Sequence, residues 1–330
     1  MSKAARLATE VDWTRFFATC RRHRIQGLVW RAIERFDLKP PNEVADLLAA
    51  DATEIASSGL RAASICARLS DDFAAADIPL LFVKGLTLST LAYGDPFVKM
   101  SHDIDVLVPL ADIDRACAAL ITLGYAQAGS RQRDPARWHK AQMESDWVRH
   151  GYPTIDLHTR LAENRRLLPG MSNRSPAQQV EIAPGITLPT LAVDELAIYL
   201  CVHGASSAWF RLKWIADVAA LLDRPGLAGV DQLLVRASQL GAGRAVPAAL
   251  LLIQRLFDTA YAPAVQQAIA TPVNQWLARI GYRELCAEAE PTERRLGTLA
   301  IHASQLLLMP GASFKASEVV RQIRSALAGG

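Results

Sequence analysis

Two aspartates in the middle of the chain have the type and spacing that a metal-binding reaction centre needs. Asp103 and Asp105 stand two positions apart at the start of the run 103–108, whose alternation is typical of a strand. Residues two apart in a strand project from the same face, so the two carboxylates are held close together. Close carboxylates repel one another, and a bound divalent cation such as Mg²⁺ removes that cost. The pair therefore predicts a metal site.

Asp156 is the third acid of this candidate site. It lies in the run 154–158, where Ile155 and Leu157 would face the core while Asp156 and His158 share the other face. If this strand lies beside the Asp103 strand in an antiparallel sheet, three carboxylates converge. Such a group can hold two metal ions about 4 Å apart, an arrangement used for in-line displacement at phosphorus. A surface pair of Asp156 and His158 is the alternative.

Lys84 and Gly85 are the candidate phosphate-binding residues. They follow an apolar run of strand length, 78–83, and precede a helical stretch that continues through Tyr93. A glycine there lets the backbone approach a ligand, and a helix N-terminus offers free N–H groups to phosphate. Lys99 adds a second possible phosphate partner, and a solvated counter-charge is the alternative for it.

The elements that position these residues fall into three segments. Apolar residues recur at helical spacing through 1–76, interrupted at Lys39-Pro40-Pro41. The segment 77–189 mixes helices and strands, with strands at 145–149 and 154–158 and a connecting loop from Leu161 to Pro189. Beyond it, 190–330 is almost wholly helical. We therefore expect an α+β protein: an N-terminal helical segment, a mixed core and a C-terminal helical domain.

Bulk properties exclude several classes of protein. The 330 residues carry a net charge of only +3 and five widely spaced cysteines, which favours a reducing cytoplasm over a disulfide framework. We expect no DNA partner from so weak a basic excess, and no membrane association, because a signal peptide and a long apolar run are lacking. The signatures of P-loop, Rossmann and α/β-hydrolase proteins are also absent.

The combination of motifs resembles one known family. The run 80–125, LLFVKGLTLSTLAYGDPFVKMSHDIDVLVPLADIDRACAALITLGY, followed by TIDLH at 154–158, resembles the uncharacterised nucleotidyltransferase family of the polymerase-β-like superfamily. Residues 203–204 and 209–217 resemble the helical signature of that family, and residues 22–28 resemble its N-terminal helix. The resemblance covers roughly 13–257.

The resemblance implies a fold and a set of site residues. The fold would be a polymerase-β-like core, a small mixed or antiparallel sheet with helices. Asp103 and Asp105 would bind the catalytic metals and Asp156 would complete the site. The superfamily commonly has Gly-Ser or Gly-Gly at the phosphate turn, and here Thr87 is the candidate for that serine contact. Residues expected to bind the nucleotide and its metal are Lys84, Gly85, Thr87, Lys99, Ser101, His158, Arg211 and Lys213.

The function expected is transfer of an NMP group from an NTP to an acceptor, with release of pyrophosphate. Mg²⁺ would be the cofactor, with Mn²⁺ as the alternative, and ATP is among the candidate nucleotides. The acceptor would be a hydroxyl of a small molecule, of a peptide or protein, or of RNA. Two alternatives keep the same fold: a nucleotide-sensing or partner-binding module without turnover, and a toxin-like tRNA nucleotidyltransferase. A D-x-D glycosyltransferase is disfavoured, because helices precede the motif.

Overall fold

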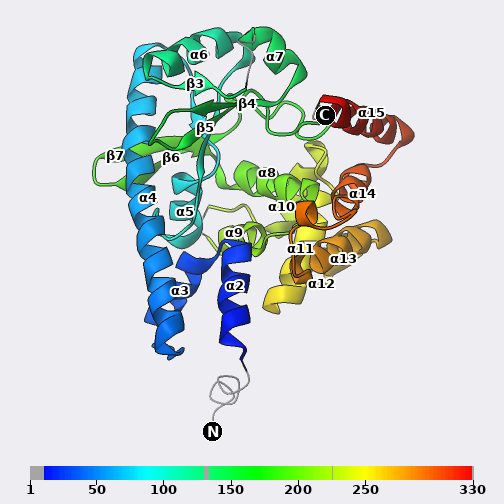
Figure 1. The fold of residues 1–330 in the computed structure, drawn as a ribbon. Helices are drawn as coiled ribbons and strands as arrows, with labels where there is room; N and C mark the ends of the chain where they lie inside the picture. Colours follow the sequence, from blue (N-terminus) through cyan, green and yellow to red (C-terminus); the bar gives the residue numbers. More distant parts are fainter. Residues whose placement is uncertain (1–10, 130–133, 225, 329–330) are drawn as a thin grey trace.

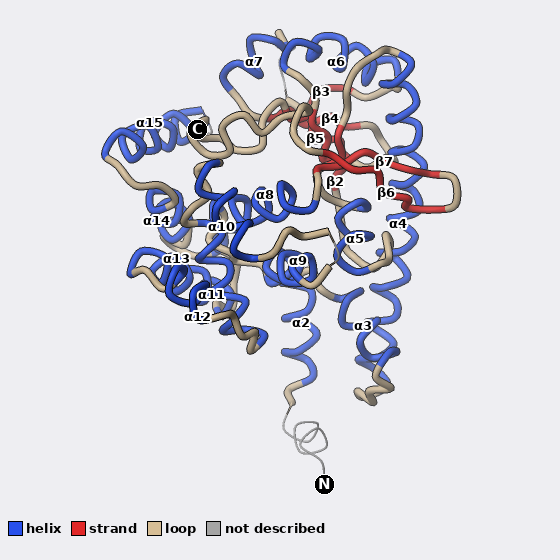
Figure 2. Tube along the Cα trace, turned by 180° about the vertical axis from the view of Figure 1, so that it is seen from behind, coloured by secondary structure: helices blue, strands red, loops and turns tan. Residues whose placement is uncertain are grey.

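A small mixed β-sheet forms the centre of the fold, and helices cover both of its faces (Figures 1 and 2). The structure, a computed structural model, describes residues 11–129, 134–224 and 226–328. The five strands are β1 (Leu81–Phe82), β2 (Asp103–Leu107), β3 (Ala126–Gln127), β4 (Glu144–Val148) and β5 (Thr154–His158), in the spatial order β1-β2-β5-β4-β3. The expectation of an α+β protein is confirmed.

The direction of β5 differs from the antiparallel arrangement expected beside β2. The two strands pair in parallel, and Asp105 lies directly opposite Asp156. The helix α6 (Ile113–Thr122) follows β2 and returns the chain before β3 begins. Because β3 and β5 are each antiparallel to β4, β5 runs in the same direction as β3, and it pairs with β2 in parallel. The expectation of an antiparallel pair was therefore wrong, although the acids still meet.

The two faces of the sheet have different partners. Ile104, Val106, Ile155 and Leu157 share one hydrophobic core with α4 (Asn42–Ala75) and with α6. Period-2 alternation turns the residues between them to the other face. There Leu107 joins a second core with the buried helix α8 (Val193–Ser206). Asp105, Asp156 and His158 lie on the face towards α8.

The N-terminal segment is helical, as expected. It consists of α2 (Trp13–His23), α3 (Gln26–Arg35) and α4, and 39–41 separates the last two. Asp12 caps α2 by accepting a hydrogen bond from the N–H of Arg15 at 2.9 Å. The long helix α4 spans the edge of the molecule and reaches the sheet with its C-terminal half (Figure 1).

The connecting loop expected from Leu161 to Pro189 contains a β-hairpin instead. Strands β6 (Ala177–Ala183) and β7 (Ile186–Leu191) pair in antiparallel fashion around a tight turn in which Gly185 has a φ of +77°. Val180, Ile182 and Leu188 are buried in the core shared by α4 and the sheet. Alternating apolar residues around a Pro-Gly dipeptide carried this signal, and the polar residues around it obscured it.

The C-terminal part is helical, as expected, and it shares a core with the sheet. Leu81, Val83 and Leu107 pack in one cluster with α8, α9 and α11. The remaining elements are α5 (Leu86–Tyr93), η1 (Leu110–Asp112), α7 (Pro135–Ala141), α9 (Leu212–Leu222), α10 (Val230–Gln239), α11 (Ala245–Phe257), α12 (Pro263–Ile269), α13 (Pro272–Cys286), η2 (Pro291–Glu293), α14 (Leu299–Leu307) and α15 (Ala312–Ala328). The division at 76 and 189 stays a prediction.

Two further expectations concern bulk properties. All five cysteines are free, and four of them are buried, so the described structure holds them as thiols. Among the helices of the described residues, none combines the length and the apolar character needed to span a bilayer.

Candidate functional site

The turn between β1 and α5 brings Lys84 and Gly85 to the site. Gly85 has φ +67° and ψ −127°, a conformation that side-chain-bearing residues avoid, so glycine is required for the chain to turn into α5. The N–H of Val83 donates to the carbonyl oxygen of Asp105 at 3.2 Å and ties the turn to β2. The turn therefore places the N-terminus of α5 beside the aspartate strand.

Thr87 supports this turn from inside the core. Its side chain is fully buried, and its hydroxyl lies 3.2 Å from the carbonyl oxygen of Lys84 and 3.3 Å from that of Phe82. A hydroxyl that donates to the backbone in a buried position holds the turn. The hydroxyl of Thr87 is therefore engaged with the backbone of the turn, and a phosphate contact for it stays a prediction.

Lys84 forms a buried ion pair with Asp105. The Nζ atom lies 2.7 Å from Oδ1, and the side chain of Asp105 is 3% exposed. Burial alone would raise the pKa of Asp105, but the charge of Lys84 and the hydrogen bond from His158 hold it well below its usual range. Burial alone would lower the pKa of Lys84, but Asp105 above all raises it well above its ordinary value. Both groups are therefore charged.

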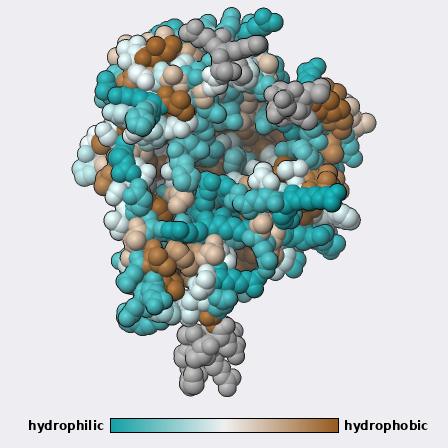
Figure 3. Space-filling model, in the orientation of Figure 1, coloured by the Kyte–Doolittle hydropathy of each residue, from teal (hydrophilic) through white to brown (hydrophobic). Residues whose placement is uncertain are grey.

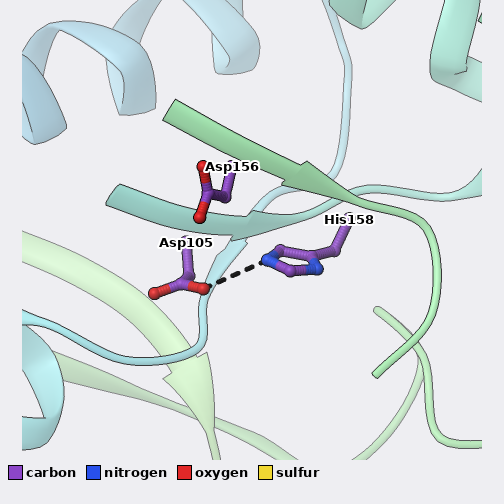
Figure 4. A group of neighbouring side chains, drawn as sticks. All are labelled: Asp105, Asp156 and His158. Atoms are coloured by element: carbon purple, nitrogen blue, oxygen red, sulfur yellow. Dashed lines mark hydrogen bonds and ion pairs between the residues drawn. The ribbon is translucent and has the colours of Figure 1, made fainter. Parts of the chain in front are cut away.

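Asp105, Asp156 and His158 form a group that could hold a metal ion. One potential ligand atom from each lies within 4.8 Å of the others, and Figure 4 shows the three side chains pointing toward one another from β2 and β5. Nε2 of His158 lies 3.1 Å from Oδ1 of Asp105. Burial, and then the charges of Asp105 and Asp103, raise the pKa of Asp156 to about 7. A negative charge on Asp156 beside the carboxylate of Asp105 is therefore unfavourable unless a cation offsets it.

Asp103 stands at the first position of β2, half-buried, and its register partner on β5 is Thr154. Asp103 is not a member of the Asp105–Asp156–His158 group, in which His158 is the third residue. Asp103 is nevertheless near enough for its charge to raise the pKa of Asp156. The structure therefore brings Asp105 and Asp156 together with a histidine, and a ligand role for Asp103 stays a prediction.

Glu144 extends the group on the far side of His158. Its Oε2 lies 3.1 Å from Nδ1 of His158, although the orientation does not make a hydrogen bond. Burial raises the pKa of Glu144. Sequence analysis missed this residue, because its role depends on the pairing of β4 with β5, in which Glu144 lies opposite His158.

A second group of charges lies near Asp103, where α9 meets α5 and the segment between α5 and β2. Lys99 pairs with Asp217 at 3.1 Å, and Asp217 also accepts the hydroxyl of Tyr93 at 2.9 Å. Both side chains of the ion pair are nearly inaccessible to solvent. Lys99 is thus a buried partner of α9. Ser101 likewise donates its hydroxyl to the carbonyl oxygen of Asp103, at 3.0 Å.

Lys213 and Arg211 both come from the start of α9 but differ in their partners. Arg211 makes a two-pronged pair with Glu290, at 2.8 Å for each contact. Burial, and then the charge of Lys99, lower the pKa of Lys213 to about 7. The described residues offer Lys213 no carboxylate at ion-pair distance, and its amine lies close enough to Asp103 for the charge of that residue to affect its pKa.

Arg24 is a residue that sequence analysis left without a role. It ends α2 in the left-handed conformation, with φ +55°, and no described carboxylate lies at ion-pair distance from its half-buried guanidinium. Burial, and then the charge of Arg211, lower its pKa, and Arg24 in turn lowers the pKa of His102, after burial. Its neighbour His23 accepts the N–H of Leu212 at 3.0 Å and so anchors α2 to α9. Only the fold brings Arg24 to this group.

A cavity of about 210 Å³ opens beside the Asp105–Asp156–His158 group. Lys84, Glu144, His158 and Tyr199 line it. Residues of α14 and α15, including Gln305 and Arg321, line it as well. The view in Figure 3 shows the surface hollowed below the sheet-bearing top of the molecule, with hydrophilic side chains around the hollow.

Fold and site together define a mixed α+β protein with a buried carboxylate–imidazole group at the junction of the sheet and the glycine turn that begins α5. The chain belongs to the uncharacterised nucleotidyltransferase family, because the sequence model of that family matches residues 9–258. The family resemblance of the motifs is therefore confirmed. No curated protein matches the chain.

Proposed function

We propose that the protein is a divalent-cation-dependent nucleotidyltransferase with a polymerase-β-like core. It would transfer an NMP group from an NTP to an acceptor hydroxyl and release pyrophosphate. The observation that carries this proposal is the Asp105–Asp156–His158 group, which lies beside the Lys84-Gly85 turn in a chain of a nucleotidyltransferase family. The catalytic residues proposed are Asp103, Asp105 and Asp156.

The donor set fits a divalent cation. Lys84 already places an ammonium charge 2.7 Å from Asp105, so this position is built to hold positive charge. Carboxylate oxygens suit Mg²⁺, whereas an imidazole nitrogen such as that of His158 is better suited to Mn²⁺ and later transition metals. We therefore propose Mg²⁺ held by the aspartates, with Mn²⁺ favoured wherever His158 is a ligand.

The reaction forms a bond between the acceptor oxygen and the α-phosphorus and breaks the bond from that phosphorus to the pyrophosphate oxygen. The acceptor proton would pass to a carboxylate oxygen of Asp156, whose pKa of about 7 suits a general base near neutral pH. A bound cation would supply neutralisation of charge on the phosphates. Lys84 would orient Asp105 and the phosphates together.

The triphosphate would lie between the turn and the cation group beside Asp103. The N-terminus of α5 offers backbone N–H groups at Gly85. Arg24 and Lys213 offer cationic groups without an ion-paired carboxylate among the described residues, which makes them better phosphate partners than Lys99 or Arg211. Lys99 and Arg211 would instead stabilise the positions of the elements around Asp103 through their ion pairs with Asp217 and Glu290.

Label transfer from an α-³²P-labelled NTP tests the proposal. Asp103→Asn and Asp105→Asn should each abolish transfer while leaving the circular dichroism spectrum unchanged. Asp114→Asn, an exposed aspartate of α6, is the matched control and should retain full transfer. Undiminished transfer by the Asp105→Asn variant would exclude this reaction centre. NTP binding without pyrophosphate release, over a broad set of acceptors, would favour a nucleotide-sensing module instead.

A further inference from the structure

A basic groove lies on the surface outside the cavity that opens beside the Asp105–Asp156–His158 group. It has a volume of about 650 Å³ and lies between α15 on one side and the end of α7 with the loop that follows β5 on the other. Its described lining includes one carboxylate, Glu163, and five cations: Lys140, Arg160, Arg165, Arg321 and Arg324. The groove is thus strongly positive in a protein whose net charge is only +3.

Most of these cations have no acidic partner. Arg321 pairs with Glu163 and Glu318, but the described residues place no carboxylate at ion-pair distance from the other four. Arg160 donates to the carbonyl oxygens of His139 and Ala141, at 3.2 and 3.0 Å, and its buried Nε has no hydrogen-bond partner. Burial, and then the charge of Arg165, lower the pKa of Arg160. Fixed cations that lie near one another without counter-charges favour an anionic ligand.

The groove continues into the cavity beside the reaction centre. Glu163, Asn164 and Arg321 line both spaces, and Lys84 and His158 also line the cavity. An extended ligand in the groove can therefore place one end beside Lys84 and His158 while its remainder stays among the cations. The cations of α15 come from a part of the chain that lies beyond the residues matched by the family model.

We propose that this groove binds the acceptor, and that the acceptor is a single-stranded oligonucleotide whose terminal hydroxyl enters the cavity. Four cations without ion-paired carboxylates exceed what a single phosphate would neutralise, which favours a chain of phosphates over a small phosphorylated molecule. The inference rests on the proposed transferase for the reaction, but strand binding by itself does not depend on it.

Charge reversal in the groove tests the binding. Lys140 and Arg324 are both exposed, so a Lys140→Glu/Arg324→Glu variant should fold normally. Fluorescence anisotropy with a labelled twelve-nucleotide oligoribonucleotide should show binding that is at least about tenfold weaker than that of the native protein. The slope of log affinity against log salt should become shallower by about 1.4, because each phosphate contact contributes about 0.7 for single strands. Lys315→Glu, an exposed lysine of α15 outside the groove lining, should bind like the native protein.

The outcomes separate this inference from the proposed transferase. Equal affinity and salt slope in the native, double-variant and Lys315→Glu proteins would overturn the groove assignment. Label transfer to a small hydroxyl compound without any strand binding would also overturn it, while leaving the transferase intact. Groove-dependent strand binding with no label transfer to any acceptor would uphold the binding site and overturn the transferase. Equal affinity for an oligodeoxyribonucleotide of the same sequence would show that the groove binds the phosphates of the strand and does not contact its 2′-hydroxyl groups.

Discussion

The Nε2 atom of His158 lies 3.1 Å from Oδ1 of Asp105 on the neighbouring strand, although 53 positions separate the two residues in the chain. The same carboxylate oxygen lies 2.7 Å from the ammonium group of Lys84. Asp105 is therefore neutralised by protein groups before any cation binds. A metal ion at this position must share or replace these contacts. Substitutions of Lys84 and His158 therefore test whether a metal ion binds at Asp105.

Lys84→Met should make the fold depend on a divalent cation. Without metal, the variant should lose about 3 kcal/mol of the free energy of unfolding, because the buried carboxylate of Asp105 loses its counter-charge. Mn²⁺ or Mg²⁺ should restore most of that loss. Urea denaturation in EDTA and in metal measures both effects.

Lys99→Met is the matched control for that variant, because it also breaks a buried lysine–aspartate pair, here with Asp217. It should be destabilised to a similar degree, and metal should stabilise it no more than the native protein. The same metal response in both variants would contradict the placement of the cation at Asp105.

His158→Gln should distinguish the two candidate metals. Loss of an imidazole donor should weaken Mn²⁺ binding at least about tenfold and Mg²⁺ binding much less, because Mg²⁺ prefers oxygen ligands. Calorimetric titration with each ion measures the change. His139→Gln removes a buried histidine that is hydrogen bonded to Ser145 instead, and it should leave both affinities unchanged. Equal losses for both ions in the His158 variant would remove His158 from the ligand set.

Lys213 should make stability depend on pH. Its pKa of about 7 in the folded protein lies below the value of about 10 expected in the unfolded chain. Between those two pKa values the unfolded chain binds one more proton than the folded protein, so the free energy of unfolding rises as the pH increases from 7 to 10. Below pH 7 Lys213 is charged in both states, and the folded protein bears the full cost of burying that charge. Lys213→Met should therefore be more stable than the native protein at pH 6, with a difference that shrinks towards pH 10. Melting temperatures across this range test the sign; a constant difference would contradict it.

Pyrophosphate should restore the charge of Lys213. At pH 8 most of the amine is uncharged in the free protein, so anion binding beside it should draw in a proton. Calorimetry in two buffers of different ionisation enthalpy measures this uptake. The native protein should take up a proton, whereas Lys213→Met should take up none beyond the ionisation of pyrophosphate itself. Identical uptake by the two proteins would place the anion elsewhere.

Arg24→Asn should weaken NTP binding without harming the fold. Asparagine tolerates the left-handed backbone at this position, and Arg24 has no described ion pair to lose. Loss of one charged contact to phosphate should weaken the affinity for NTP about tenfold or more. Equilibrium binding of an NTP together with the melting temperature tests both parts. Arg35→Ala, at the end of α3, should bind NTP like the native protein.

Local patterns in the sequence were enough to place most helices and strands, and to place Asp105 and Asp156 on two of the strands. Alternation predicted β2 and β5, and helical spacing predicted the almost wholly helical part beyond residue 189. Gly85 and the lysine before it marked the turn. Such features depend on residues within a few positions of one another, so they can be read without the fold. The hairpin β6–β7 escaped because its apolar residues are few and interleaved with polar ones.

Sequence alone thus determined the family, the α+β class and the presence of acids on two strands. The tertiary structure decided that β5 runs parallel to β2, that His158 joins Asp105 and Asp156, and that Arg24 faces the same group as Lys213. Strand direction and the meeting of distant helices depend on packing between segments far apart in the chain. Because alternation along one strand is the same in either direction, no local pattern could choose the pairing that completes the site.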